Sequence, residues 1–197
     1  MRLNTILGKI LHADYERFED LLEVSDIYSN ESLRDNLDKI MREWKNNKIS
    51  LSVLNAQLKF IYSYIDQQRI KISFQNHIAF PIGYFSSFLR LNACFIYSYL
   101  KTNYINVKLF RLYKGFDKFK NFIKSKKPPY VIFTLSQFHY LDYLKQLIPF
   151  LENQNVNVVL GGNVFIYDED LKKSFPNSIF PKDCSELVNL LKLTIKV

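Results

Sequence analysis

From about residue 77 to residue 197, short apolar runs alternate with stretches of helical periodicity. This alternation is typical of a parallel sheet whose strands are joined by crossover helices. Five strands are predicted, at His77 to Pro81, Asn106 to Leu112, Tyr130 to Leu135, Asn157 to Leu160 and Ser178 to Phe180. Because such crossovers are right-handed, the helices must cover both faces of the sheet.

The helices between these strands are predicted at Leu89 to Lys101, Phe116 to Ser125, Tyr140 to Glu152 and Glu169 to Ser174, with a last helix from Cys184. Asp183 and Glu186 have the spacing of a capping box at the start of that last helix. Residues 76–197 are therefore expected to form a flavodoxin-like (Rossmann-like) α/β domain with a five-stranded parallel sheet.

The first 70 residues show helical periodicity instead. Their apolar positions form four stripes: Leu3, Ile6, Leu7, Ile10 and Leu11; then Phe18, Leu21 and Leu22; then Leu33, Leu37, Ile40, Met41 and Trp44; then Leu54, Leu58, Ile61 and Ile65. Asp14 and Ser50 are suitable N-cap residues for two of these helices. We expect residues 1–70 to form a four-helix bundle that precedes the α/β domain.

The formal net charge of +8 could direct the chain to nucleic acid or to an anionic surface. Five lysines are dense between Lys118 and Lys127, but they alternate with Phe116, Phe119, Phe122 and Ile123 at helical spacing. This pattern favours the solvated face of an amphipathic helix. Salt-sensitive nucleic-acid binding is kept as a hypothesis, and direct DNA binding without a partner is not expected.

Only two cysteines are present, Cys94 and Cys184, and their spacing indicates neither a disulfide framework nor a zinc site. No segment has the apolar length of a membrane span or of a signal peptide. We therefore expect a cytoplasmic protein with no membrane association. The sequence also contains no nucleophile with a base, P-loop or GxGxxG in a supporting context, so we expect no enzyme.

In a sheet of this kind, ligands bind beyond the carboxyl ends of the strands. Three loops lie there, Ile82 to Phe88, Thr134 to His139 and Gly161 to Asn163. The Gly161-Gly162 pair lets the backbone approach a ligand, because glycine has no Cβ. A tight strand-to-helix turn explains the same pair without a ligand.

The stretch PYVIFTLSQFHYLDYLKQLIPFLENQNVNVVLGGNVF resembles the cobalamin-binding domain of MerR-type light- or cobalamin-sensing transcriptional regulators. The segment WKNNKISLSVLNAQLKFIYSYI resembles that family's helical cap. The resemblance implies that Thr134 and Ser136 contact the lower tail of the cofactor, and that Gly161 and Gly162 make room for it. It also implies that Trp44 lies against the upper face of the corrin; packing in the helical core is the alternative.

The chain departs from that family where the metal is held. Leu54 and Asn55 replace a Glu-His pair of the cap, and IGYFSSFLRLN replaces the loop that carries the lower histidine ligand. Leucine accepts no hydrogen bond and asparagine is a poor metal ligand, so conventional cobalt ligation is not expected. Bulky side chains stand where a corrin would need space: Phe80, Tyr84, Phe85 and Phe88.

Two histidines are candidate axial ligands of a corrin or haem metal. His77 is the candidate near the first strand, although a position within that strand is the favoured explanation for it. His139 follows the third strand, where a surface histidine at a helix start is the alternative.

The leading hypothesis is a non-enzymatic sensory or regulatory module with non-standard or lost tetrapyrrole binding. It would act through a protein partner, either a transcription factor or another copy of the chain. The alternative is a corrinoid or haem carrier that serves an enzyme, with His77 or His139 as axial ligand. The cofactor would be cobalamin or haem.

Overall fold

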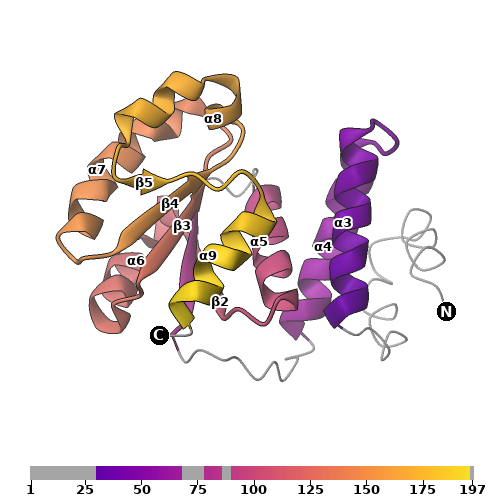
Figure 1. Cartoon of the computed structure of the whole chain (residues 1–197), viewed down its shortest axis with the longest axis horizontal. Coiled ribbons are helices and arrows are strands. Elements are labelled where there is room, and N and C mark those ends of the chain that lie inside the picture. Colours follow the sequence, from indigo (N-terminus) through magenta and orange to yellow (C-terminus); the bar gives the residue numbers. More distant parts are fainter. Residues whose placement is uncertain (1–29, 68–77, 86–89, 196–197) are drawn as a thin grey trace. The chain divides into compact units, whose positions relative to one another are not determined.

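The computed structural model describes residues 30–67, 78–85 and 90–195. The chain divides into two compact units, Met1–Ile72 and Ser73–Val197 (Figure 1). A helical part therefore precedes an α/β part, as the sequence predicts.

The described part of the first unit consists of α3 (Asn30–Lys45) and α4 (Leu51–Gln67), which pack on each other. The predicted stripes form their core: Leu33, Leu37, Ile40, Leu54, Leu58, Ile61 and Ile65 are buried. The N-cap at Ser50 is confirmed, because its Oγ accepts a hydrogen bond from the N–H of Val53 at 3.3 Å. The other two predicted helices, and Asp14, lie outside the described residues, so the four-helix bundle stays a prediction.

In the described part of this unit, the pKa of one carboxyl departs from its ordinary value. Burial raises the pKa of Asp38 on α3, and the nearby Arg42 opposes that rise. Burial disfavours the charged form of a carboxyl, which explains the direction.

The second unit contains five strands: β1 (Phe80–Tyr84), β2 (Val107–Arg111), β3 (Tyr130–Thr134), β4 (Asn157–Gly161) and β5 (Ser178–Ile179). Its helices are α5 (Arg90–Thr102), α6 (Leu112–Lys126), α7 (Leu141–Glu152), α8 (Val164–Tyr167) and α9 (Cys184–Ile195). Two 3₁₀ helices complete it, η2 (Phe138–Tyr140) and η3 (Glu169–Ser174). The capping box at α9 is confirmed, since Asp183 Oδ1 accepts from the N–H of Glu186 at 2.9 Å.

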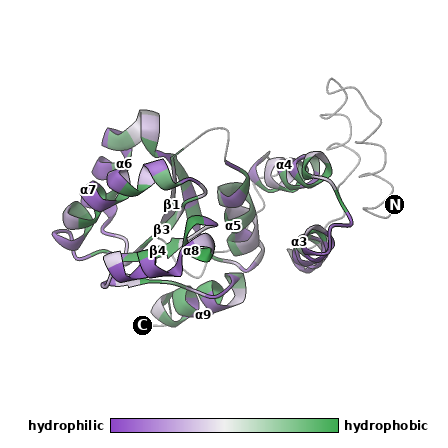
Figure 2. Ribbon diagram, turned by 90° about the horizontal axis from the view of Figure 1, so that it is seen from above, coloured by the Kyte–Doolittle hydropathy of each residue, from purple (hydrophilic) through white to green (hydrophobic). Residues whose placement is uncertain are grey.

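All strands are parallel, and their order is β2-β1-β3-β4-β5. This is the flavodoxin-like order, in which the chain reverses its direction of winding between β1 and β3. Helices α5 and α9 cover one face of the sheet, and α6 and α7 cover the other (Figures 1 and 2). The predicted fold class is confirmed.

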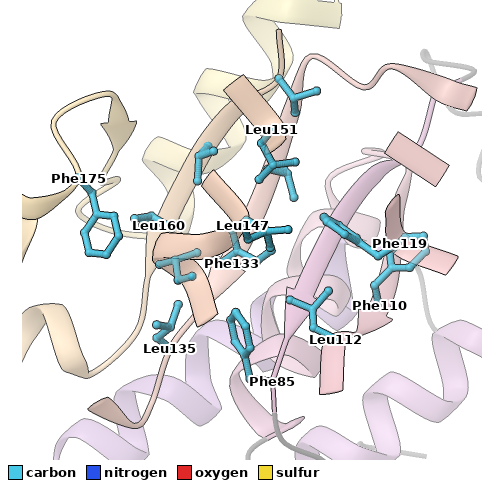
Figure 3. Packing of buried hydrophobic residues seen from close by; sticks show 14 of the residues in the cluster. Phe85, Phe110, Leu112, Phe119, Phe133, Leu135, Leu147, Leu151, Leu160 and Phe175 are labelled. Carbon is cyan, nitrogen blue, oxygen red and sulfur yellow. The ribbon is translucent and has the colours of Figure 1, made fainter. Parts of the chain in front are cut away.

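One hydrophobic core of this unit lies between the sheet and α6 and α7. It contains side chains from alternate positions of β3 and β4, together with Phe119, Leu147 and Leu151 of the covering helices (Figure 3). Gly83 of β1 is required by this packing, because a Cβ there would lie 2.5 Å from the ring of Phe133. The ring thus occupies the space that a side chain on β1 would fill.

The first strand is later in the sequence than predicted. We expected it to end at Pro81, with a loop from Ile82, but β1 continues through Ile82 and Gly83 to Tyr84. Proline interrupts a strand only where its missing N–H is needed. The N–H of Phe80 points to β2, where it donates to Asn106 at 2.8 Å, so the nitrogen of Pro81 points to the other side. On that side, pairing with β3 is made by Ile82 and Gly83.

Two helix predictions need smaller corrections. Helix α6 begins at Leu112, earlier than predicted, but its backbone is kinked and non-helical at Gly115, whose φ is −138° and ψ is 26°. The part after the kink begins at Phe116, where the helix is predicted to start. The short helix α8 was not predicted, and Glu169–Ser174 is a 3₁₀ helix.

Candidate functional site

A pocket of about 440 Å³ opens at the carboxyl ends of β3 and β4, on the face that α5 and α9 cover. Its lining is mainly apolar and includes four charged residues. The apolar residues are Ile96, Ile132, Phe133, Val159, Leu160, Phe165, Ile166, Phe180, Pro181 and Leu187, the charged residues are Glu169, Lys172, Lys182 and Asp183, and Gly161, Gly162 and Cys184 complete the lining. A small-molecule site typically has this size and this mixture of surfaces.

Gly161 gives the pocket its open side. Side chains alternate between the faces of a strand, so position 161 faces the same side as Val159, which lines the pocket. A Cβ at Gly161 would have no other heavy atom within 4 Å. The absence of a side chain at this position therefore leaves space that a ligand can use.

Gly162 has a different role from Gly161. Its φ is +110°, and a Cβ there would overlap the main chain of Leu135. The N–H of Leu135 donates to the carbonyl of Gly161 at 2.9 Å, and the N–H of Val164 donates to the carbonyl of Leu135 at 3.4 Å. Gly162 thus allows the segments after β3 and β4 to pack backbone against backbone, as a tight turn requires.

The two predicted hydroxyl residues lie close to this edge but do not line the pocket. Thr134 is buried and pairs with Gly161 in the sheet. Ser136 is half-buried, and its Oγ accepts a hydrogen bond from Nδ2 of Asn92 on α5 at 3.1 Å. This bond ties the segment after β3 to the helix after β1.

The carboxyl end of β1 is filled by side chains. Tyr84 and Phe85 are both buried. The ring of Phe85 stacks on Tyr140 at 5.3 Å between centroids and lies 6.2 Å from the ring of Phe133. Figure 3 shows Phe85 at the end of the core, beside Leu112 and Leu135. Phe80 is fully buried in the strand itself, and Phe88 lies outside the described residues.

The predicted metal ligands are not brought to the pocket. His139 is exposed on η2 with its ring 4.0 Å from that of Tyr140, and it does not line the pocket. His77 lies outside the described residues. Across residues 30–67, 78–85 and 90–195, no group of three or more His, Cys, Asp or Glu residues could hold a metal ion. The sequence from Gly83 to Arg90, GYFSSFLR, contains no histidine either.

Trp44, Leu54 and Asn55 belong to the helical unit. Trp44 is half-buried near the end of α3, Leu54 is in the core of that unit, and Asn55 is exposed on α4. The roles predicted for Trp44, as a core residue or as a contact of the corrin, both stay predictions.

Sequence reasoning missed the side chains from α5, α8 and α9 that wall the pocket, among them Ile96, Phe165 and Leu187. They are far apart in the sequence and belong to ordinary apolar stripes. Only the topology, which puts the first and last helices of the sheet on one face, could have indicated that they meet.

None of the described helices is long and apolar enough to cross a membrane.

No model of a known protein family matches this sequence, and no curated protein matches it. Among solved structures, the fold is similar to that of a novel cobalamin-binding protein from Desulfitobacterium hafniense DCB-2, with a TM-score of 0.53 and 12% identity. The similarity covers 96% of this chain and 89% of the other. At this identity the likeness concerns the fold, and it extends over nearly the whole of both chains.

Proposed function

We propose that this chain is a non-enzymatic sensory or regulatory module that binds a corrinoid by its nucleotide tail, without a metal ligand from the protein. The observation that carries the proposal is the pocket beside Gly161 at the ends of β3 and β4. The similarity of fold to a cobalamin-binding protein supports the class of ligand.

The residues present suit the nucleotide tail of such a ligand and not its metal. A mainly apolar pocket of about 440 Å³ can hold a flat heterocycle, and the charged residues of its lining can face the polar sugar and phosphate. At the β1 side of the same edge, the segment after the strand carries the buried Phe85 and no histidine, so it would offer no ligand to a metal. We therefore assign affinity to the tail and no ligation to the described residues.

A regulatory role requires that binding alters contacts with something else. Ser136 and Asn92 connect the pocket's edge to α5 through a 3.1 Å hydrogen bond, so a ligand at this edge can bias the position of that helix. The partner that reads such a change would be a protein, either a transcription factor or a second copy of the chain.

Comparing cobalamin with cobinamide, which has the same corrin ring but lacks the nucleotide tail, tests the proposal. Equilibrium dialysis of the full chain should show saturable cobalamin binding and at least about tenfold weaker cobinamide binding, a difference of about 1.4 kcal/mol. Equal affinities, or no binding of either, would contradict the proposed function.

The alternative function is a corrinoid or haem carrier with His77 or His139 as axial ligand. Exposure of His139 leaves its imidazole accessible to a metal. No histidine lines the pocket, and for this reason we favour tail binding without a metal ligand from the protein.

A further inference from the structure

The positive charge of the chain is concentrated in one segment of the α/β unit. Residues 108–127, which comprise most of β2 and all of α6, contain eight Lys or Arg residues and a single acidic residue, Asp117. The whole chain carries a formal net charge of +8. This segment therefore dominates the electrostatic attraction of the protein for anionic partners.

A groove of about 750 Å³ runs between β2 and α6 within this segment. It is lined by Lys108, Leu109, Phe110, Arg111, Gly115, Lys118, Asn121, Phe122 and Ser125. Three of these side chains are cationic, and no carboxylate is among them. We call this surface the β2 groove; its lining is complementary to an anionic occupant that also has apolar groups.

Strand β2 is an edge strand, since among the described residues it pairs with β1 alone. The N–H of Phe80 donates to the carbonyl of Asn106, which fixes which residues face β1. In a parallel ladder the main-chain groups of alternate residues point to opposite sides, so those of Val107 and Leu109 point away from β1. Such a row of main-chain donors and acceptors can pair with an added strand.

The ammonium group of Lys108 lies over the two aromatic rings of the groove. The rings of Phe110 and Phe122 lie 4.9 Å apart, and Nζ of Lys108 lies 5.5 and 5.6 Å from their centroids. Nucleobases bind to single-strand sites by stacking on open ring faces. An ammonium over both rings disfavours such stacking and instead offers a carboxylate a partner beside an apolar surface.

A second copy of β2 is also a poor occupant of this edge. Lysines on an edge strand discourage pairing between identical edges, because like charges would meet. An acidic strand meets no such penalty.

We propose that the β2 groove binds an extended acidic segment of a partner protein, which adds to the sheet at β2. Carboxylates on the face of that segment that is turned to α6 pair with Lys108 and Lys118, while its apolar side chains, on the opposite face, lie beside Leu109. This inference does not depend on corrinoid binding, because the groove and the pocket share no lining residue.

The test uses the full chain and two labelled peptides of equal length and charge. One alternates Glu with Val, and the other has the same sequence with every main-chain nitrogen methylated, so that it has no N–H for a ladder in either register. Fluorescence anisotropy should show binding of the Glu-Val peptide that weakens at high salt, with at least about tenfold weaker binding of the N-methylated peptide. Hydrogen exchange at Val107 and Leu109 should slow when the Glu-Val peptide binds.

Matched variants identify the surface. Lys118→Glu should weaken binding of the Glu-Val peptide at least about fivefold. Lys145→Glu, which reverses the charge of an exposed lysine on α7, should change the affinity for that peptide less than about twofold. Equal binding of the two peptides, equal effects of the two variants, or no binding would overturn the proposal. Tighter, Lys118-dependent binding of an oligothymidylate would overturn it in favour of single-stranded nucleic acid.

Discussion

At the carboxyl edge of the sheet, the region after β4 is open and the region after β1 is filled by side chains. At β4 the chain places Gly161 and Gly162, and a pocket remains open. At β1 it places Tyr84 and Phe85, which are buried and close the edge. Ligands of this fold are expected at the reversal point between β1 and β3. The comparison teaches that in this chain the space open to a ligand lies beside β4 and not after β1.

The largest expected effect concerns the backbone at β4. Gly162→Ala forces a Cβ onto the main chain of Leu135 and onto a φ of +110°. Overpacking and backbone strain together should lower the free energy of unfolding by about 4 kcal/mol. Chemical denaturation measures this loss.

Gly161→Ala is the matched control, because its Cβ meets open space. Its free energy of unfolding should stay within about 1 kcal/mol of the wild-type value. If both substitutions have the same effect, the distinction between the two glycines is wrong.

At the β1 end, Phe85→Ala should lower the free energy of unfolding by about 3 kcal/mol, because a buried ring that contacts Phe133 and Tyr140 is lost. Phe138→Ala removes a ring that is 49% exposed and should cost less than about 1 kcal/mol. Cobalamin affinity of folded Phe85→Ala should remain within about twofold of wild type. Loss of binding with unchanged stability would locate the site at β1 instead.

A pocket-filling substitution sharpens the comparison further. Gly161→Leu extends a side chain into the open space of the pocket and should weaken cobalamin binding at least about tenfold. Gly115→Leu is the control, since a Cβ there also meets open space but outside this pocket. Equilibrium dialysis of both variants is the measurement. Unchanged binding by Gly161→Leu would show that the ligand does not use this space.

The smallest effect is expected at the histidines. His139→Ala and His77→Ala should leave the visible spectrum of bound cobalamin unchanged and its affinity within about twofold, because tail binding needs no imidazole. Loss of a ligation-shifted band in either variant would favour the carrier function.

Periodicity was sufficient to predict the strands β2 to β5, the helices on both faces and the caps at Ser50 and Asp183, since each depends on local patterning. It failed at β1, because Pro81 reads as a strand end unless the side to which its nitrogen points is known. The sequence indicates a role for both Gly161 and Gly162, but only the structure distinguishes them. A side chain has space at Gly161, whereas at Gly162 it would overlap the main chain of Leu135.

The walls of the pocket could not be predicted from local patterns. Ile96 and Leu187 are ordinary stripe residues whose meeting depends on how α5 and α9 pack. The aromatic content of the β1 end was visible in the sequence, but whether Phe85 pointed into the core was not.

A crystal structure of the full chain with cobalamin tests the central claim most directly. We predict the nucleotide tail beside Gly161, between β4 and α9, with no protein side chain bound to cobalt. A tail outside this pocket, or cobalt bound by His77 or His139, would contradict the account.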